Sequence, residues 1–254
     1  MAEFDRYQIY MLLNQRPPLW LVEIDLSGAM LNGVQLKDAN LNRAKLGKTL
    51  LHFAKLNNAS LSGADLSGAG ATHADFSDAD LINVNLSGAD LSGAKLINAL
   101  LTGANLGKIN LKDADLSGAD LNNAVLGGAV LDGADFTSAF LKNAFLGRAA
   151  NKITTLIAAR LMNTDLTSAN LSTASLLNAN LQGAILTSAM LELTNLREAN
   201  LSGAMLANAN LTNADLSGAK LDSANLKGAK VTETQLKKAA SLTKTILPDG
   251  TVHA

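Results

Sequence analysis

The sequence predicts an all-β solenoid, in which the chain winds repeatedly around one filled core. Three regularities predict it. Every fifth residue from Leu26 to Leu236 belongs to one series of 43 positions, and 38 of these are leucine. Alanine stands two residues before 34 of the 43 positions, and glycine, asparagine or aspartate stands two residues after 26 of them. A repeat this regular has to be interpreted before any single residue.

The five-residue period excludes both common secondary structures as continuous elements. On an α-helix the leucines would rotate around the axis, and on a strand they would alternate between faces. A repeat of three strand residues and a two-residue corner solves this problem, because alanine and leucine then both point inward. Glycine, asparagine and aspartate tolerate the positive φ that a type II turn needs at the corner. The period alone leaves three-, four- and five-sided coils open.

Several segments carry the pattern with little variation, including ADLSG at 64–68, ANLGK at 104–108 and ADLSG at 214–218. This pattern, A(D/N)LXX, resembles the pentapeptide repeat family over about 85% of the chain. The resemblance implies a right-handed quadrilateral β-helix with four repeats per coil, and therefore about eleven coils. At the ~4.8 Å spacing of neighbouring strands, the rod is expected to be roughly 50 Å long.

Two places depart from the repeat inside the predicted rod. Ala71 and Phe76 occupy consecutive leucine positions, where one small and one large residue can conserve volume. Asn151 also occupies a leucine position, and Thr154 an alanine position. We expect a local distortion over 147–160 with the rod continuing. The alternative is that the five residues NKITT (151–155) leave the coil, which would move every later repeat by one face.

The two ends are predicted to be capped by short helices. Residues 1–20 form a predicted N-terminal helical cap, which Pro17 and Pro18 end. The β-helix is assigned to 21–231. Residues 232–254 form a predicted C-terminal helix and tail, in which Thr232 and Gln235 match a capping box. Caps would cover the exposed strand edges, which favours a monomer. The alternative is that a terminal helix joins two rods into an end-to-end homodimer.

Composition restricts the chemistry. The net charge of −1 lacks the basic excess of a nucleic-acid binder, and the chain has no cysteine. No nucleophile–base pair is evident, and we expect no catalytic residue, no cofactor and no metal site. His52 and His73 fall near each other in a four-sided coil but without a third ligand.

The N-terminus does not resemble a signal peptide and no segment resembles a membrane span, so a cytoplasmic protein without membrane contact is expected.

One surface feature stands out from the repeat. The residue before each leucine should point to solvent, yet it is apolar at four positions that differ by multiples of twenty and would share a face, interrupted by Asp165. Two further apolar residues would lie on the flanking faces. This predicted protein-interaction stripe consists of Val125, Phe145, Ile185 and Met205, flanked by Val130 and Phe140. Contiguous exposed apolar surface often marks a partner site, although scattered surface hydrophobics are common.

The sequence favours a non-enzymatic scaffold that presents extended surface to an unknown protein partner. The family resemblance implies an alternative, a DNA mimic that binds gyrase in the manner of quinolone-resistance proteins, and it also implies that such proteins are abundant in cyanobacteria. A DNA mimic needs a negative excess. Residues 1–149 have a net charge of −3, whereas residues 150–254 have a net charge of +2.

The inward assignment of the leucines predicts the effect of two neighbouring substitutions. Leu116→Asp should unfold the rod, because it buries an unpaired charge, with a loss of more than about 4 kcal/mol of stability. Asp115→Ser should change little, because Asp115 points outward. Far-UV circular dichroism during thermal melting measures both. A β spectrum retained by Leu116→Asp would contradict the assignment.

Overall fold

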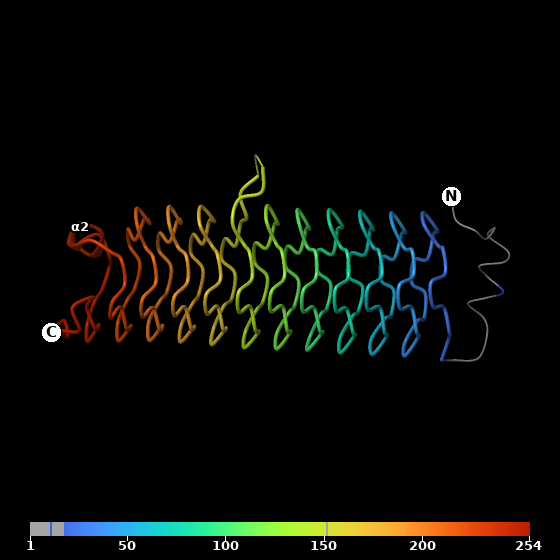
Figure 1. Ribbon diagram of the computed structural model, residues 1–254, viewed down its shortest axis with the longest axis horizontal. Coiled ribbons are helices and arrows are strands. Elements are labelled where there is room, and N and C mark those ends of the chain that lie inside the picture. The colour runs from blue at the N-terminus through green and yellow to red at the C-terminus, as the bar shows by residue number, and fades with distance from the viewer. Residues whose placement is uncertain (1–10, 12–17, 151) are drawn as a thin grey trace.

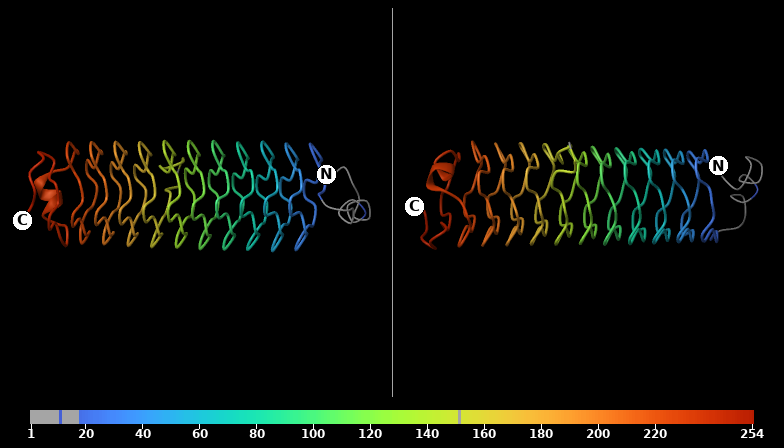
Figure 2. Two further views of the ribbon diagram at one scale, coloured as in Figure 1. Left: turned by 90° about the horizontal axis from the view of Figure 1, so that it is seen from below. Right: turned by 45° about the horizontal axis from the view of Figure 1, so that its top comes forward.

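The computed structural model describes residue 11 and residues 18–150 and 152–254. The residues from 18 onward form a straight rod (Figures 1 and 2). The predicted N-terminal helical cap lies outside the described residues, apart from residues 11 and 18–20. Figure 1 shows a regular stack of coils from residue 18 to the C-terminus, with one loop projecting from its side. Among the described residues, no helix is long and apolar enough to cross a membrane.

Parallel β-bridges connect each coil to the next. In the first part of the rod every bridge joins residues twenty positions apart, as in Trp20 to Asn40 and Asp25 to Lys45, so that four repeats make one coil. The bridged residue is the one before each leucine. We number the four faces by their first bridged residue: face 1 begins at Trp20, face 2 at Asp25, face 3 at Met30 and face 4 at Gln35.

Each corner is a tight turn of the predicted kind. In the corner from Leu26 to Ala29, the Ala29 N–H donates to the carbonyl of Leu26 at 3.0 Å, and Gly28 has a φ of 72°. The second corner residue keeps a positive φ even where it is not glycine, for example 57° at Leu193. A non-glycine residue in this region costs roughly 1–2 kcal/mol. The inter-coil hydrogen bonds and the buried leucines therefore enforce the turn at positions whose local preference opposes it.

The interior of the rod is filled by the leucines and alanines of the repeat, which are buried along the whole stack. Ala71 and Phe76 are both fully buried, as volume compensation within one coil requires. Threonine replaces alanine at a few inward positions, and its hydroxyl then donates to a backbone carbonyl. Thr164 Oγ1 lies 2.6 Å from the carbonyl oxygen of Phe136, and Thr194 Oγ1 lies 2.9 Å from that of Leu171. These bonds satisfy a polar group that the core would otherwise leave unpaired.

The loop changes the register of the rod. From Val130 to Phe145 the bridges join residues 25 positions apart, as in Val130 to Thr155 and Phe145 to Asn170, and from Thr155 onward the spacing returns to twenty. The rod continues, but the expectation of a mere local distortion is wrong, because five residues have left the coil. The looped segment is 149–153 rather than 151–155, since Thr154 is buried and Thr155 is bridged on face 3.

There is a physical reason why this repeat, rather than another, leaves the coil. Residues 149–153 are the repeat whose leucine position is occupied by Asn151, and burying an amide without partners costs about 1–3 kcal/mol. Expelling one whole repeat keeps the neighbouring leucines inside. Thr154 closes the base of the loop: its Oγ1 accepts from the Gly128 N–H at 2.9 Å and also lies 2.9 Å from the carbonyl oxygen of Gly147.

The C-terminal helix is a single short turn that is tied to the last coil. Helix α2 spans Glu233–Leu236, and its N-terminus has the predicted capping box between Thr232 and Gln235. The Gln235 side chain has a second role: its Nε2 lies 2.7 Å from the carbonyl oxygen of Leu211 and 2.9 Å from that of Ala214. The amide thus takes the place of a further coil at this edge of face 3.

The segment after α2 returns to the β-helix rather than forming a tail. Ser241 and Ile246 form parallel bridges with Lys220 and Asn225, so the ladder continues beyond the predicted boundary at residue 231. The spacing of 21 shows that α2 adds one residue to its side of the coil. Val252 then pairs antiparallel with Ile246, and this return strand covers the end of face 1. The polar, helix-like composition of 232–239 conceals this resumption of the repeat.

The expelled repeat predicts that residues 149–153 are dispensable for folding. Their deletion joins Arg148 to Thr154 and restores an uninterrupted repeat without moving any face of the rod. We expect a melting temperature at least equal to that of the wild type, because the deletion removes loop residues without removing a buried leucine. Deleting 169–173 is the matched control, since it removes buried Leu171 and about 1.5–3 kcal/mol of apolar burial. A greater loss for the 149–153 deletion would contradict the assignment.

Candidate interaction surface

The described part of the rod offers shallow grooves rather than an enclosed site. One hollow of about 580 Å³ runs along the corner between faces 4 and 1, over Asn163, Gly183, Gly203 and Ser223. It is lined by turn residues and by no histidine or basic group. Within the described residues, no group of three or more histidine, cysteine, aspartate or glutamate side chains is placed to hold a metal ion.

The two central histidines pair with other residues rather than with each other. The Nδ1 of His52 lies 2.7 Å from the hydroxyl of Thr72. The ring of His73 stacks on Phe53, with 5.3 Å between the ring centroids and 15° between the planes. Gly70 leaves room for His52, since a Cβ there would lie 2.9 Å from its ring. Both imidazoles therefore act in the packing of adjacent corners.

The outward aspartates and asparagines stabilise the corners. At Asp115, Oδ1 accepts from the Ser117 N–H at 3.0 Å and from the Ser117 hydroxyl at 2.7 Å. The same bond from the N–H two residues later recurs along the rod, for example at Asp65 and Asp90. Asparagine and aspartate form such turns readily. This geometry explains the preference of the repeat for these residues without a catalytic role.

One of these carboxylates has a shifted pKa with clear causes. Partial burial of Asp75 would raise the pKa of its carboxyl, but hydrogen bonds from the Ser77 hydroxyl and N–H, together with the charges of Lys55 and Lys95, outweigh burial and lower it. The Ser77 Oγ lies 2.7 Å from Asp75 Oδ1, and Lys55 Nζ lies 3.6 Å from Oδ2. The ionised form of Asp75 is therefore favoured in the folded protein.

The predicted single apolar stripe is wrong in its geometry, because the loop divides it between two faces. Val125 and Phe145 are bridged neighbours on face 2, but the next residue on that face is Asn170. Ile185 and Met205 lie on face 1. The prediction assumed a constant twenty-residue spacing, and the expelled repeat moves every later residue by one face.

The shift by one face after the loop brings together other residues of the predicted apolar stripe. Phe140 lies on face 1, in one column with Asp165, Ile185 and Met205. Face 2 carries Val125, Phe145 and, further along, Met190, while Val130 lies on face 3. The side chains of Val125, Phe140, Met190 and Met205 are exposed by 44–49%. The sequence analysis missed Met190; a 25-residue step across the loop, followed by a 20-residue step, would have placed it on the face of Phe145, two coils further along.

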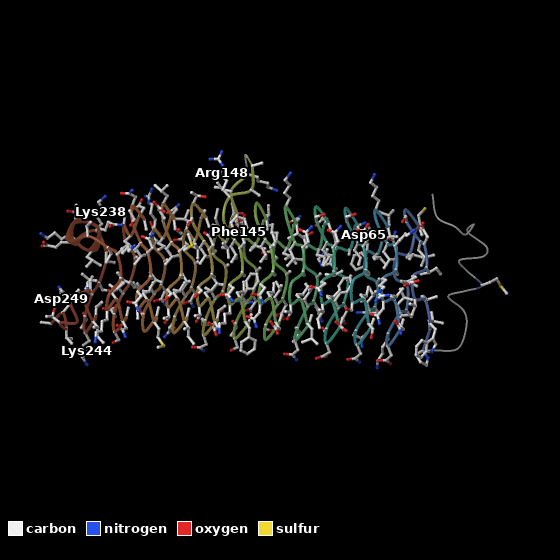
Figure 3. The ribbon with its side chains drawn as sticks, viewed as in Figure 1. Asp65, Phe145, Arg148, Lys238, Lys244 and Asp249 are labelled. Carbon is white, nitrogen blue, oxygen red and sulfur yellow. The ribbon has the colours of Figure 1, made fainter. Side chains whose placement is uncertain are left out.

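Phe145 packs against the rod rather than projecting from it. Figure 3 shows its ring beside the coil and Arg148 extending outward on the loop above it. A Cβ on Gly127 would lie 2.7 Å from Phe145 Cε1, and a Cβ on Gly147 would lie 3.0 Å from Cε2. The absence of side chains at Gly127 and Gly147 thus creates the place for this ring, which gives Phe145 a structural role at the base of the loop.

Charge is unevenly distributed along the rod. Residues 61–140 contain ten aspartates and three lysines, whereas residues 141–254 contain eleven basic and seven acidic residues. Most of the ten aspartates lie on faces 4 and 1 or at the corners that bound face 4. Asp75 and Asp135 have basic partners there, in Lys55 and Arg160. The loop lies at the diagonally opposite corner, between faces 2 and 3.

The sequence matches the profile of a family described as pentapeptide repeats, in eight copies. The matched residues are 20–47, 35–70, 44–81, 72–107, 109–148, 159–197 and 194–233. The matches leave out 149–158, the region that contains the expelled repeat. A comparison with curated proteins gives no significant match.

Solved structures of several such proteins are similar to this chain. HetL, a pentapeptide repeat protein involved in heterocyst differentiation regulation in the cyanobacterium Nostoc sp. strain PCC 7120, is 36% identical, with 89% of this chain and 94% of HetL covered and a TM-score of 0.42. A trypsin-treated variant of QnrB1, a plasmid-mediated fluoroquinolone resistance protein, is 19% identical over 76% of this chain and 89% of its own, with a TM-score of 0.37. A pentapeptide repeat protein from the Arabidopsis thaliana thylakoid lumen is 26% identical over 49% and 72%, with a TM-score of 0.27.

The lowered pKa of Asp75 predicts an acid dependence of stability. Because the folded state favours ionised Asp75, its contribution is present above the ordinary value of about 3.8 and is lost as the pH falls through the lower folded value. Asp75→Asn should therefore flatten the loss of stability of the wild type below about pH 4. Urea unfolding at a series of pH values measures this slope. An unchanged slope would contradict the proposed stabilisation of the carboxylate.

Proposed function

The chain belongs to the pentapeptide repeat family, and on this basis we propose that it is a non-enzymatic scaffold that binds a protein partner through one side of a right-handed quadrilateral β-helix. The observation that carries the proposal is the concentration of exposed apolar side chains on faces 1 and 2 between residues 125 and 205. Val125, Phe140, Met190 and Met205 all lie there.

The architecture supports a binding role over a catalytic one. Leucines fill the interior, so the chain cannot enclose a substrate as a pocket enzyme does. The outward aspartates are engaged in turn hydrogen bonds, and the histidines pack into corners. A solenoid instead offers a long, rigid surface on which side chains keep fixed spacings. The backbone of such a surface loses little further conformational freedom when a partner covers it.

A second candidate function is gyrase binding by DNA mimicry. The ten aspartates of residues 61–140, clustered toward face 4, are the observation that favours it. The basic excess of residues 141–254 opposes it, since a duplex mimic needs negative charge along its full length. A supercoiling assay with purified gyrase tests this candidate: inhibition that disappears when Asp115 and Asp120 are replaced by asparagine would favour it over the scaffold.

We further propose that the rod has about eleven coils and that its C-terminal end is closed, so that no second rod joins it at that end. We also propose that the protein is cytoplasmic. Three contacts support closure. Gln235 Nε2 hydrogen-bonds with the edge carbonyls of Leu211 and Ala214. Helix α2 covers the same side, and Val252 pairs antiparallel with Ile246. Each blocks the strand edge that a second rod would extend.

Affinity capture with three variants tests the scaffold. Ile185→Ser/Met205→Ser alters face 1, and Val125→Ser/Met190→Ser alters face 2. Leu50→Ser/Ile157→Ser is a control that removes exposed apolar side chains from face 3 and from its corner with face 4. We expect wild type and control to retain one specific partner, and at least one face variant to lose most of it. Unaltered circular dichroism ensures that the variants are folded.

The proposal fails if wild-type protein retains no specific partner, or if both face variants retain it as well as the control does. Phe145 is not used as a probe, because its ring supports the base of the loop.

A further inference from the structure

The base of the loop is held together by hydrogen bonds between Arg148, Ala149, Ala150 and Lys152. The N–H groups of Ala149 and Lys152 each donate to the other's carbonyl, at 2.9 and 3.0 Å, and close it as an antiparallel pair. Arg148 Nε donates to the carbonyl of Ala150 at 3.0 Å. Gly127 and Gly128 leave room for the loop to pack against the rod. A Cβ on Gly127 would lie 3.0 Å from Ala149 Cβ, and a Cβ on Gly128 would lie 3.3 Å from Lys152 Cβ.

Deletion of the loop would remove no leucine from the core. The leucines on both sides, Leu146 and Leu156, are fully buried in consecutive coil sides. Ordering each loop residue costs roughly 1–2 kcal/mol of backbone entropy. Exclusion of Asn151 from the core explains why the repeat leaves the coil, but it does not require the hydrogen bonds that order the projection, and these present a defined surface for recognition.

The chemistry of this corner is basic and apolar. Arg148 and Lys152 are exposed on the loop, and Lys108 is exposed one coil below Gly128. Among the described residues, none of these three takes part in an ion pair. Val125 on face 2 and Ile153 at the end of the loop are exposed by 44% and 42%. We call these five residues the loop surface.

We propose that the loop surface binds an acidic, partly apolar segment of a partner protein. This inference rests on the scaffold function and names the chemistry of its partner. The carboxylates of the segment would lie against Arg148, Lys152 and Lys108, and its apolar side chains against Val125 and Ile153. The aspartates of faces 4 and 1 lie on the far side of the rod. Asp90, on face 3, pairs with Asn110 near Lys108, so the positive charge of the loop surface rests mainly on Arg148 and Lys152.

A protein segment fits this surface better than a nucleic acid does. Duplex binding relies on many phosphate contacts, whereas the loop surface has three cations. A long polyanion would also experience the repulsion of the ten aspartates in residues 61–140. A short acidic segment can remain at the basic corner and use the two apolar side chains as anchors.

Fluorescence anisotropy with defined probes tests the proposal. The probes are a labelled peptide rich in glutamate and leucine, its counterpart with lysine in place of glutamate, and a short DNA duplex. We expect only the glutamate peptide to bind the wild type, more tightly at low salt. Arg148→Glu/Lys152→Glu should weaken it about tenfold or more. Lys227→Glu/Lys230→Glu makes the same change of charge on exposed lysines elsewhere and should alter binding less than about twofold.

Other outcomes overturn the proposal. Equal weakening in both double variants would show a general effect of net charge, and preferential binding of the duplex would assign the surface to nucleic acid. Absence of binding by the glutamate peptide would also overturn it. The 149–153 deletion, which keeps the rod but removes Lys152 and Ile153, should also weaken binding.

The same variants separate this inference from the scaffold function. In affinity capture, a specific partner that Arg148→Glu/Lys152→Glu retains as well as wild type does would leave the scaffold standing and refute the loop surface. Failure of the wild type to retain any partner would refute the scaffold itself.

Discussion

Burial of one leucine per five residues is the constraint on which the rest of this structure depends. A leucine can return to the interior every fifth residue only if each repeat supplies one short side and one corner. That requirement imposes a positive φ even on Leu193, and it gives aspartate and asparagine their place before the leucine, where they bond to the corner N–H. The parallel ladder between coils then completes the hydrogen bonding of the backbone. Individual corner preferences are weak beside the combined burial of the core.

The same constraint explains how the rod accommodates a defective repeat. Asn151 would place an amide among leucines, and the chain expels the whole repeat 149–153 instead of distorting around it. Because one repeat is one side of the coil, both flanking repeats keep their leucines inside. The consequence extends well beyond the loop: Ile185 and Met205 lie on face 1, whereas Phe145 lies on face 2. A local change in one repeat thus reassigns the surface of the entire second half of the rod.

The loop and the C-terminal end show how side chains replace a missing neighbour in the ladder. At the loop, the Thr154 hydroxyl bonds to Gly128 and Gly147 where the coil is interrupted. At the end of the rod, the Gln235 amide bonds to the carbonyl of Ala214, which the ladder would otherwise have paired, and to the corner carbonyl of Leu211. Both groups satisfy backbone polar atoms at a break in the repeat. These sites are also where the rod differs most from a uniform surface, and the proposed partner site lies at the first of them.

The sequence by itself determined which residues of each repeat point inward and outward, the position of the corners and the capping box at Thr232 and Gln235. These properties depend on neighbours within a few residues, so a local pattern is sufficient to predict them. The number of sides per coil came only from family resemblance, and which residues share a face was decided by the tertiary structure. Val125 and Ile185 lie 60 positions apart, and their relative placement depends on every repeat between them, including the one that leaves the coil. The return of residues 241–246 to the ladder was likewise decided by pairing with Lys220 and Asn225, because α2 inserts one residue and hides the five-residue period.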